Sequence, residues 1–358
     1  YIVEGYQAMG YDAVNAGHRE AQLTAEQLRA WEAKYGFFVS TNLMDAEGNP
    51  VLPPYRIVDF PNHYRVGILG VMESTLEAAE LGEGLHIAEP VDAIAKYLPE
   101  LKAQVDTIVL LAFTDEEEMK SLATRFFELD VIVGGNVIQP IPSPLKVNRS
   151  VLVSITDKGK AVGQLTLTRD ASGVMTPSSE VHMLLEDVAD ASEGTAIVDA
   201  FKKELANMDF QPHRDDEEGL TTITSARSKE ANAYVTAESC ASCHPKATEL
   251  WEASKHAHAF ASLEKREHQY NPRCLQCHTV GYGSSDGFIN ERLSPMLKNV
   301  SCENCHGRAG YHVRFHSGET IPARAAILKS VQCESCHDKD NSVNFDPTTY
   351  WEMIKHGK

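Results

Sequence analysis

Long hydrophobic runs are absent from this 358-residue chain. No apolar stretch reaches the roughly 18 residues that a membrane-spanning helix needs. Residues 108–113 have the length of a buried strand instead. The start of the chain at Tyr1 also lacks the features of a signal peptide. The sequence therefore predicts no transmembrane segment.

Cysteine is absent outside four short motifs, which leaves none for disulfide bonds. Each motif has the pattern C-x-x-C-H, at residues 240–244, 274–278, 302–306 and 333–337. A zinc site is the alternative interpretation of paired cysteines, but here a His directly follows the second Cys every time. This arrangement is the attachment signature of c-type haem, so we predict four covalently bound haems. The cysteines that would form the thioether bonds are Cys240, Cys243, Cys274, Cys277, Cys302, Cys305, Cys333 and Cys336.

The His that ends each motif is the expected proximal ligand of a haem iron. These residues are His244, His278, His306 and His337. Haem attachment to this motif takes place outside the cytoplasmic membrane. We therefore expect a periplasmic or extracellular protein whose signal peptide has been removed.

Six further His in the same region are candidates for the distal position. His256 and His258 would point about 200° apart on a helix, so both cannot face one haem. His316 lies four residues after His312, on the same face of a helix. His268 lies in a polar stretch before the second motif. For His258, His268 and His316, surface exposure or a hydrogen bond to a haem propionate is the alternative role.

The first 200 residues have the alternating pattern of an α/β domain. Residues 25–35 predict a helix that begins at the N-cap Thr24, with Gln27 completing a capping box. Further helices are expected at residues 91–105, 121–128 and 195–206, and strands at 37–39, 64–71, 107–113 and 131–133. A hairpin is expected between residues 150–155 and 162–169, around a turn at 157–159.

Residues 10–20, GYDAVNAGHRE, resemble the G-Y-D-A-V-x-x-G-N-H-E segment of 5′-nucleotidase-type metallophosphoesterases. The similarity continues in order through residues 48–50, 66–71, 105–113, 130–138 and 158–163, and covers roughly residues 1–171. The resemblance implies an α/β metallophosphoesterase-like domain. In that family, this part of the chain supplies ligands for paired catalytic metal ions.

Several positions depart from the family pattern. The Asn and His of G-N-H-E are replaced by His18 and Arg19, and only Glu20 is kept. The His after the central strand becomes Phe113, and the two His of G-G-H-x-H become Asn136 and Ile138. Two-metal hydrolysis requires a dense set of ligands, which Phe and Ile cannot provide and which Arg19 would oppose. We interpret the site as one that has lost its chemistry, although His18 and Arg19 offer an alternative role in binding an anion or a partner.

The C-terminal region resembles the cytochrome c554-type multihaem family. The matching segments are residues 237–244, 251–257, 274–282, 300–307 and 350–357. The resemblance implies three distal ligands, His256, His312 and His356. It also implies that one iron is five-coordinate, and the haem of His278 is our choice. The order of the two regions is similar to that of bacterial nucleotidase/cytochrome c fusion proteins.

Met can also serve as a distal ligand, but Met296 and Met353 are the only Met residues after residue 233. We therefore expect mostly bis-His, low-spin haems of low potential, packed into a loop-rich and mainly α-helical domain. The predicted domains are a metallophosphoesterase-like domain at residues 1–208, a linker at 209–232 and a tetrahaem domain at 233–358.

Acidic residues concentrate in the N-terminal part. The chain has a net charge of −18, and the 126 residues from Ala233 onward are neutral, with 14 basic and 14 acidic residues. The first 232 residues therefore hold 33 − 14 = 19 basic and 51 − 14 = 37 acidic residues. This excess of negative charge is unfavourable for binding nucleic acid and favours a basic redox partner.

The leading hypothesis is a multihaem cytochrome that transfers electrons between redox partners. The candidate partners include other cytochromes and copies of the same chain in a larger complex. One alternative is a redox enzyme with an open five-coordinate haem that acts on a small nitrogen compound. The other is an active metal-dependent phosphohydrolase.

Overall fold

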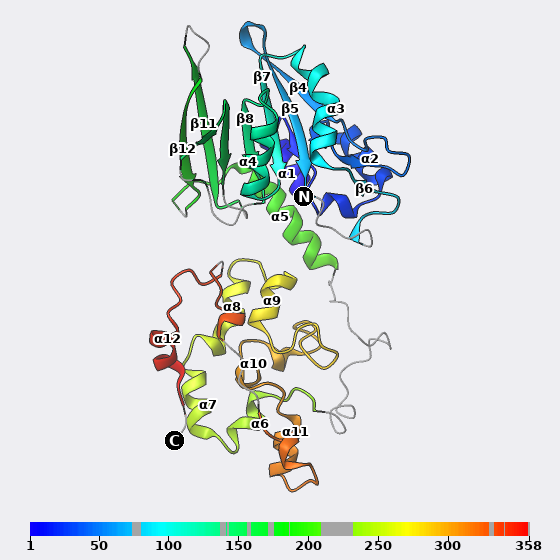
Figure 1. The fold of residues 1–358 in the computed structure, drawn as a ribbon. Helices are drawn as coiled ribbons and strands as arrows, with labels where there is room; N and C mark the ends of the chain where they lie inside the picture. Colours follow the sequence, from blue (N-terminus) through cyan, green and yellow to red (C-terminus); the bar gives the residue numbers. More distant parts are fainter. Residues whose placement is uncertain are drawn as a thin grey trace. The chain divides into compact units, whose positions relative to one another are not determined.

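A computed structural model of the chain describes residues 1–73, 80–136, 141, 143–155, 159–170, 175–185, 187–208, 232–328, 333–339 and 341–356. The chain divides into two compact units, Tyr1–Thr195 and Ala196–Lys358 (Figure 1). The predicted linker at residues 209–232, except for its last residue, and the candidate Ile138 lie outside the described residues. The predicted domain boundaries therefore remain a prediction.

The N-terminal unit contains an α/β arrangement, which confirms the predicted fold class of this region. Its strands are β1 (Val14–Asn15), β2 (Phe38–Val39), β3 (Leu43–Met44), β4 (Tyr55–Phe60), β5 (Tyr64–Met72), β6 (His86–Ile87), β7 (Thr107–Phe113), β8 (Val131–Gly134), β9 (Leu145–Val147), β10 (Ser150–Ser154), β11 (Ala161–Arg169) and β12 (Met175–Met183). Its helices are α1 (Ile2–Ala8), η1 (Glu20–Gln22), α2 (Ala25–Tyr35), η2 (Pro61–His63), α3 (Pro90–Lys102) and α4 (Glu116–Arg125), and α5 (Ser192–Met208) crosses the boundary between the units.

A six-stranded sheet with the order β4-β5-β7-β8-β10-β9 forms the centre of this unit. Strands β5, β7, β8 and β10 run parallel, and β4 and β9 pair antiparallel at the two edges. The apolar run of β7 is buried because parallel strands are covered on both faces. Leu110 of β7 packs in one cluster with Leu101 of α3 and Leu122 of α4. Phe113, at the end of β7, packs against a second cluster that contains Leu28 of α2.

The ends of the helices follow from their capping residues. The Thr24 side chain accepts a hydrogen bond from Gln27 N, and the Gln27 side chain accepts one from Thr24 N. These two bonds confirm the predicted capping box of α2. The predicted helix over residues 121–128 was wrong at both ends, because α4 runs from Glu116 to Arg125. Asp115 caps its start by accepting from Glu118 N at 2.8 Å, and the acidic first turn favours the positive end of the helix dipole.

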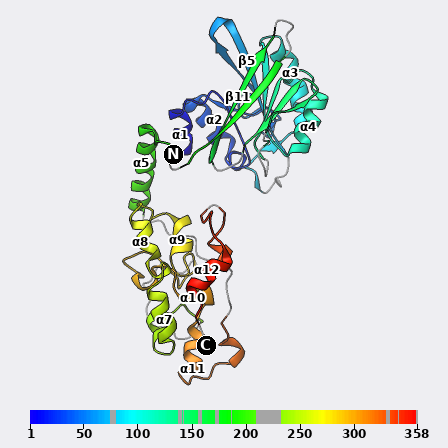
Figure 2. The same ribbon diagram turned by 90° about the vertical axis from the view of Figure 1, so that its left-hand side faces the viewer.

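The predicted hairpin between residues 150–155 and 162–169 was wrong. Strand β10 pairs in parallel with β8. Strand β11, which is also labelled in Figure 2, pairs antiparallel with β12 in a separate two-stranded sheet (Figure 1). The physical reason is burial. Val151 and Leu152 are fully buried, as in an inner strand of the main sheet, whereas most residues of β11 are exposed and none is buried.

The C-terminal unit contains short helices joined by loops, as predicted. Its helices are α6 (Ala237–Ala241), α7 (Pro245–Glu252), η5 (His256–His258), α8 (Ala259–Glu264), α9 (Pro272–His278), η6 (Pro295–Leu297), α10 (Cys302–His306), α11 (Gly310–His316), η7 (Ala323–Ala325), η8 (Cys333–Ser335) and α12 (Pro347–Ile354). Its apolar cluster consists of Phe260, Leu263, Leu275, Val280, Phe288 and Leu297 with a few partly buried neighbours. Such a small cluster is what we expect where cofactor faces supply much of the core.

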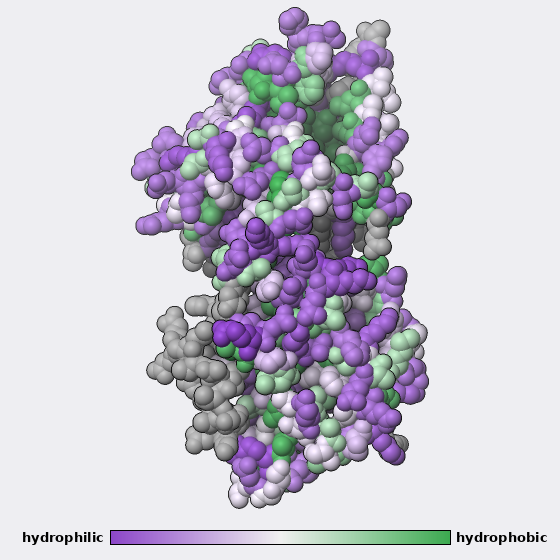
Figure 3. All heavy atoms as spheres, turned by 180° about the vertical axis from the view of Figure 1, so that it is seen from behind, coloured by the Kyte–Doolittle hydropathy of each residue, from purple (hydrophilic) through white to green (hydrophobic). Residues whose placement is uncertain are grey.

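Polar residues predominate on the face of the protein drawn in Figure 3, with apolar residues scattered among them. Across the described ranges, no helix has the combination of length and apolar character that would span a membrane.

Candidate haem-binding sites

Each C-x-x-C-H motif lies on a helical turn or at the end of one. Helices α9 and α10 contain the second and third motifs entirely. In the first motif His244 N donates to Cys240 O at 2.8 Å, and in the fourth His337 N donates to Cys333 O at 2.9 Å. Residues three and four apart share a side of such a turn. The local backbone therefore places both Cys and the His of one motif where they can face a single haem.

Three of the motif His face a second His ring across a nearly constant gap. The ring centroids of His244 and His312 are 6.3 Å apart, those of His256 and His337 are 6.0 Å apart, and those of His306 and His356 are 5.7 Å apart. Two imidazoles bound to one metal from opposite sides, each through a bond of about 2 Å, place their centroids about 6 Å apart. These six residues therefore fit three bis-His haem irons.

Hydrogen bonds at Nδ1 orient several of these rings. His278 Nδ1 lies 2.8 Å from Ala259 O, His312 Nδ1 lies 3.1 Å from Ala326 O, and His356 Nδ1 lies 2.9 Å from Ile354 O. A carbonyl can only accept, so each Nδ1 carries the proton and each Nε2 is left with a lone pair for a metal. His337 Nδ1 is similarly held 3.0 Å from Ser342 Oγ. Sequence analysis did not find these partners, because a backbone carbonyl leaves no signal in the sequence.

His278 differs from the other motif His. In the described part of the chain, no imidazole ring faces it at the spacing of the three pairs. Its ring is fixed on one side by Ala259 O, and Ser262 Oγ lies 3.5 Å from the same Nδ1. Among the described residues, the His of the second motif thus lacks the facing imidazole that each of the other three motif His has.

The three further His candidates do not face a motif His at that spacing. His258 is exposed, although it lies next to the paired His256 in η5. His316 packs against His312, with a centroid distance of 4.6 Å. Burial is the main cause that lowers the pKa of His268 below its usual value, with Lys202 and Arg266 contributing. The structure therefore brings together the three His that the resemblance implied and leaves the other three beside them.

Contacts between cysteines show which motifs are neighbours. A hydrogen bond between Cys240 and Cys302 raises the pKa of the Cys240 thiol and lowers the pKa of Cys302 to about 7. Burial, together with the nearby Cys336 thiol, raises the pKa of Cys277 to about 12. Burial raises the pKa of Cys305, and the Cys333 and Cys336 thiols add to this effect. The motifs therefore adjoin in the order first, third, fourth, second.

The candidate phosphoesterase site lies at the carboxyl ends of the parallel strands, where α/β folds bind ligands. Phe113 lies close to both loops at this edge, since a Cβ added at Gly135 would lie 3.2 Å from its ring and a Cβ added at Gly17 would lie 3.9 Å from it. The His18 ring contacts Phe113 edge to face, with centroids 4.9 Å apart. Glu20 Oε2 accepts from Gly17 N at 2.9 Å.

Asn136, at the end of β8, donates from Nδ2 to Glu73 Oε1 at 2.6 Å. Arg19 is exposed. Within the described ranges, no three His, Cys, Asp or Glu side chains are grouped so that they could hold a metal ion. His18, Glu20 and Asn136 thus contact protein groups at this edge of the sheet.

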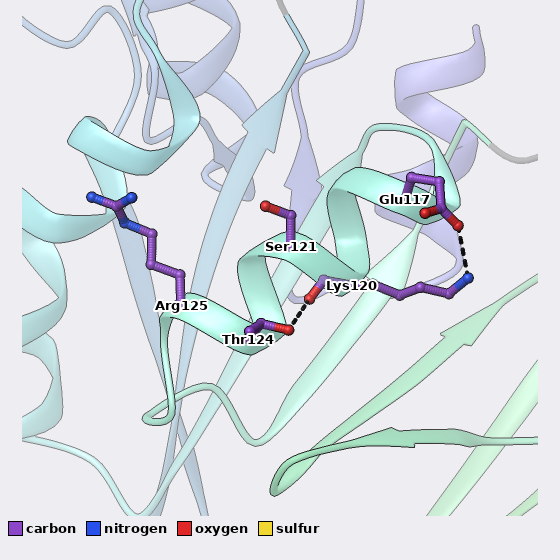
Figure 4. A pocket seen from close by; sticks show the side chains of 5 residues that line it. All are labelled: Glu117, Lys120, Ser121, Thr124 and Arg125. Carbon is purple, nitrogen blue, oxygen red and sulfur yellow. Dashed lines mark hydrogen bonds and ion pairs between the residues drawn. The ribbon is translucent and has the colours of Figure 1, made fainter.

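A separate hollow of about 480 Å³ lies on the surface of α4 (Figure 4). Lys120 in this hollow forms ion pairs with Glu117 at 2.8 Å and Glu116 at 2.9 Å. These two carboxylates raise the pKa of Lys120 to about 12. The hollow contains none of the predicted site residues, and its Lys120 is already paired with carboxylates.

Comparison with known proteins agrees with this two-part description. Residues 239–307 match the sequence family described as cytochrome c554 and c-prime. Cytochrome c-554 of Nitrosomonas europaea is 34% identical over 104 residues, which are 25% of this chain and 44% of that protein.

Among solved structures, the sulfate thiohydrolase SoxB of Thermus thermophilus matches with a TM-score of 0.52 and 22% identity. The matched region is 59% of this chain and 40% of SoxB. A 5′-nucleotidase precursor, also of Thermus thermophilus, matches with a TM-score of 0.50 and 23% identity. The matched region is 60% of this chain and 47% of the nucleotidase chain. The chain thus spans less than half of the length of each of these proteins. At this identity the structural likeness defines the fold alone.

The N-terminal region therefore has the α/β fold of the calcineurin-like and 5′-nucleotidase-type phosphoesterases, which confirms the predicted resemblance. The C-terminal region is similar to the cytochrome c554 family, a match that implies c-type haem and supports a role in electron transfer.

Proposed function

We propose that this chain is a tetrahaem c-type cytochrome that transfers electrons between redox partners outside the cytoplasm. The observation that supports this proposal best is the set of three His pairs with centroid distances of 5.7–6.3 Å, each joining one motif His to a His outside the motifs. Residues from distant parts of the C-terminal unit meet at one spacing, and that spacing suits a metal held between two imidazoles.

The haems would be attached through the eight Cys of the four motifs. His244 and His312 would hold the first haem, His306 and His356 the third, and His337 and His256 the fourth. A haem iron supplies a one-electron couple whose potential depends on axial ligands and burial. Bis-His ligation and the carbonyl-held Nδ1 atoms favour low-spin irons of low potential.

The order of neighbouring motifs supports a path through the protein. Cysteines of the first and third motifs, of the third and fourth, and of the fourth and second are close enough to shift each other's pKa. Electrons that enter at the first haem would leave at the second, after passing the other two.

A second candidate function rests on His278, which faces no second imidazole among the described residues. The haem of the second motif would then keep one axial position open, where a small nitrogen compound can bind. Addition of NO or hydroxylamine to the haem-loaded protein should shift a high-spin signal from one haem in four. If all four irons are low-spin and none responds, this second function is excluded.

We assign a docking or assembly role to the N-terminal unit, in preference to nucleotide hydrolysis. The Phe113 ring lies against His18 in its candidate site, and Glu20 accepts a hydrogen bond from the backbone of Gly17. The acidic excess of the first 232 residues would attract a basic redox protein, and a second cytochrome or a further copy of this chain remains a candidate partner.

Electron exchange with a basic cytochrome tests the leading proposal. The reduced, haem-loaded protein is mixed with an oxidised basic cytochrome, and the rate is followed at increasing salt concentration. We expect rapid exchange whose rate falls as salt screens the acidic surface. Failure to exchange electrons with any c-type cytochrome, or a mass lacking four haems, would refute the proposal.

A further inference from the structure

Glu303 is a buried acidic residue inside the third haem motif. It lies between Cys302 and Cys305 and is only 3% exposed. Glu334 occupies the same place in the fourth motif and is exposed. A carboxylate in the interior is costly unless it is hydrogen-bonded, so the burial of Glu303 requires an explanation.

Both carboxylate oxygens of Glu303 accept hydrogen bonds from the backbone. Oε2 accepts from Val235 N at 2.9 Å, and Oε1 accepts from Ala309 N at 2.8 Å. The two donors are more than 70 residues apart in sequence. One side chain thus joins two segments of the C-terminal unit.

These two segments carry the two axial ligands assigned to the first haem. Val235 lies just before Thr236, the N-cap of α6, and α6 leads into the first motif, which ends at His244. Ala309 is the N-cap of α11, and α11 carries His312. The Glu303 carboxylate therefore lies at the point where the His244 and His312 segments meet.

Further contacts close the same junction. Gly310 N donates to Ala233 O at 3.1 Å, and Tyr311 N donates to Asn232 Oδ1 at 2.9 Å. The approach is so close that a Cβ at Gly310 would lie 2.7 Å from both Ala233 N and Ala233 O. Only a glycine fits at this position without moving the segment away.

We propose that Glu303 is a positioning residue that holds the His244–His312 pair at its spacing and keeps the first motif against the third. The inference rests on the proposed assignment of His244 and His312 to one iron. It accounts for the burial of Glu303, because this carboxylate joins the two segments that carry His244 and His312, whereas Glu334 is exposed. It also agrees with the contact between Cys240 and Cys302, which flank this junction.

The variant Glu303→Gln tests the role with little change in shape. An amide has one acceptor oxygen where the carboxylate has two, so one of the two backbone N–H groups loses its partner. The matched control is Glu334→Gln, which makes the same chemical change at the same motif position on an exposed residue. A third variant, His312→Ala, removes the distal ligand itself.

The readout is the high-spin share of the haem-loaded proteins, measured by quantitative EPR and by the amount of CO bound per chain after reduction. In the native protein we expect one high-spin iron in four, and in His312→Ala two in four. Glu303→Gln should lie between these values, with a shifted potential of one haem, and Glu334→Gln should equal the native protein. A Glu303→Gln protein identical to the native one in spin state and potential would overturn the proposal.

Two other results can be told apart from an unchanged Glu303→Gln protein. If His312→Ala leaves the spin state unchanged, the haem assignment fails, and the positioning role fails with it. If Glu303→Gln does not load haem, Gly310→Ala decides, since it keeps the carboxylate but pushes residues 232–235 away. A raised high-spin share in Gly310→Ala supports the role of the junction, and an unchanged share overturns it.

Discussion

Replacing His256 by alanine should open one haem without disturbing the others. His256 faces His337 with a centroid distance of 6.0 Å, and burial is the main cause that lowers its pKa below the usual value. A buried neutral imidazole is suited to act as a metal ligand, because its nitrogen keeps the lone pair. Its removal leaves His337 as the sole axial ligand of the fourth haem.

The size of the effect follows from the number of His pairs. The structure contains three such pairs, and His278 faces no imidazole in the described part of the chain. The native protein should therefore hold one high-spin iron in four, and His256→Ala should hold two in four. The high-spin share should double, from one quarter to one half.

Quantitative EPR of the oxidised protein and CO binding to the reduced protein both measure this share. His258→Ala is the matched control, since His258 lies two residues away on the same short helix and is exposed. We expect its spectra to match those of the native protein. The reasoning is refuted if His256→Ala remains at one quarter, or if His258→Ala gives the increase instead.

Three further predictions concern the rest of the chain. Leu110→Ala, at a fully buried position in β7, should lower the free energy of unfolding by about 2–5 kcal/mol in urea denaturation, whereas Val162→Ala, at an exposed position, should change it by less than about 0.5 kcal/mol. Asp346 caps α12, and hydrogen bonds from Thr349 and Thr348 hold the pKa of its carboxyl below the usual 3.8. The stabilisation of α12 by this cap is therefore present above pH 3.8 and is lost as the pH falls through the lowered pKa of the folded protein. Asp346→Asn should keep His356 bound but remove this acid sensitivity from its low-spin signal, and an unchanged acid transition would contradict the role of the cap. Nucleotide hydrolysis with added Mn²⁺ should be the same in the native protein and in Glu20→Gln, and a rate that depends on Glu20 would restore the phosphohydrolase hypothesis.

The haem motifs could be predicted from the sequence because their chemistry is local. Two Cys and a His within five residues define the attachment site whatever the surrounding fold. The distal ligands are different, because His312 and His316 differ only in where α11 directs them. The family resemblance favoured the His that the structure places opposite the motif His, whereas spacing alone left six candidates.

The burial of individual side chains was the property that could be predicted least well from the sequence. Glu303 and Glu334 occupy equivalent motif positions, and only the contacts with Val235 and Ala309 distinguish them. The expected pairing of β10 with β11 failed for a related reason, since strand pairing depends on which faces are covered. The capping box at Thr24 was predicted correctly because it involves side chains only three residues apart.

The account depends most on the three His pairs, and a crystal structure of the haem-loaded protein, with the iron atoms located by anomalous scattering, tests them most directly. We predict four irons, of which one lies between His244 and His312, one between His306 and His356, and one between His337 and His256. The fourth should be bound by His278 alone among the protein's imidazoles. An iron held by any other His pair, or fewer than four irons, would contradict the account.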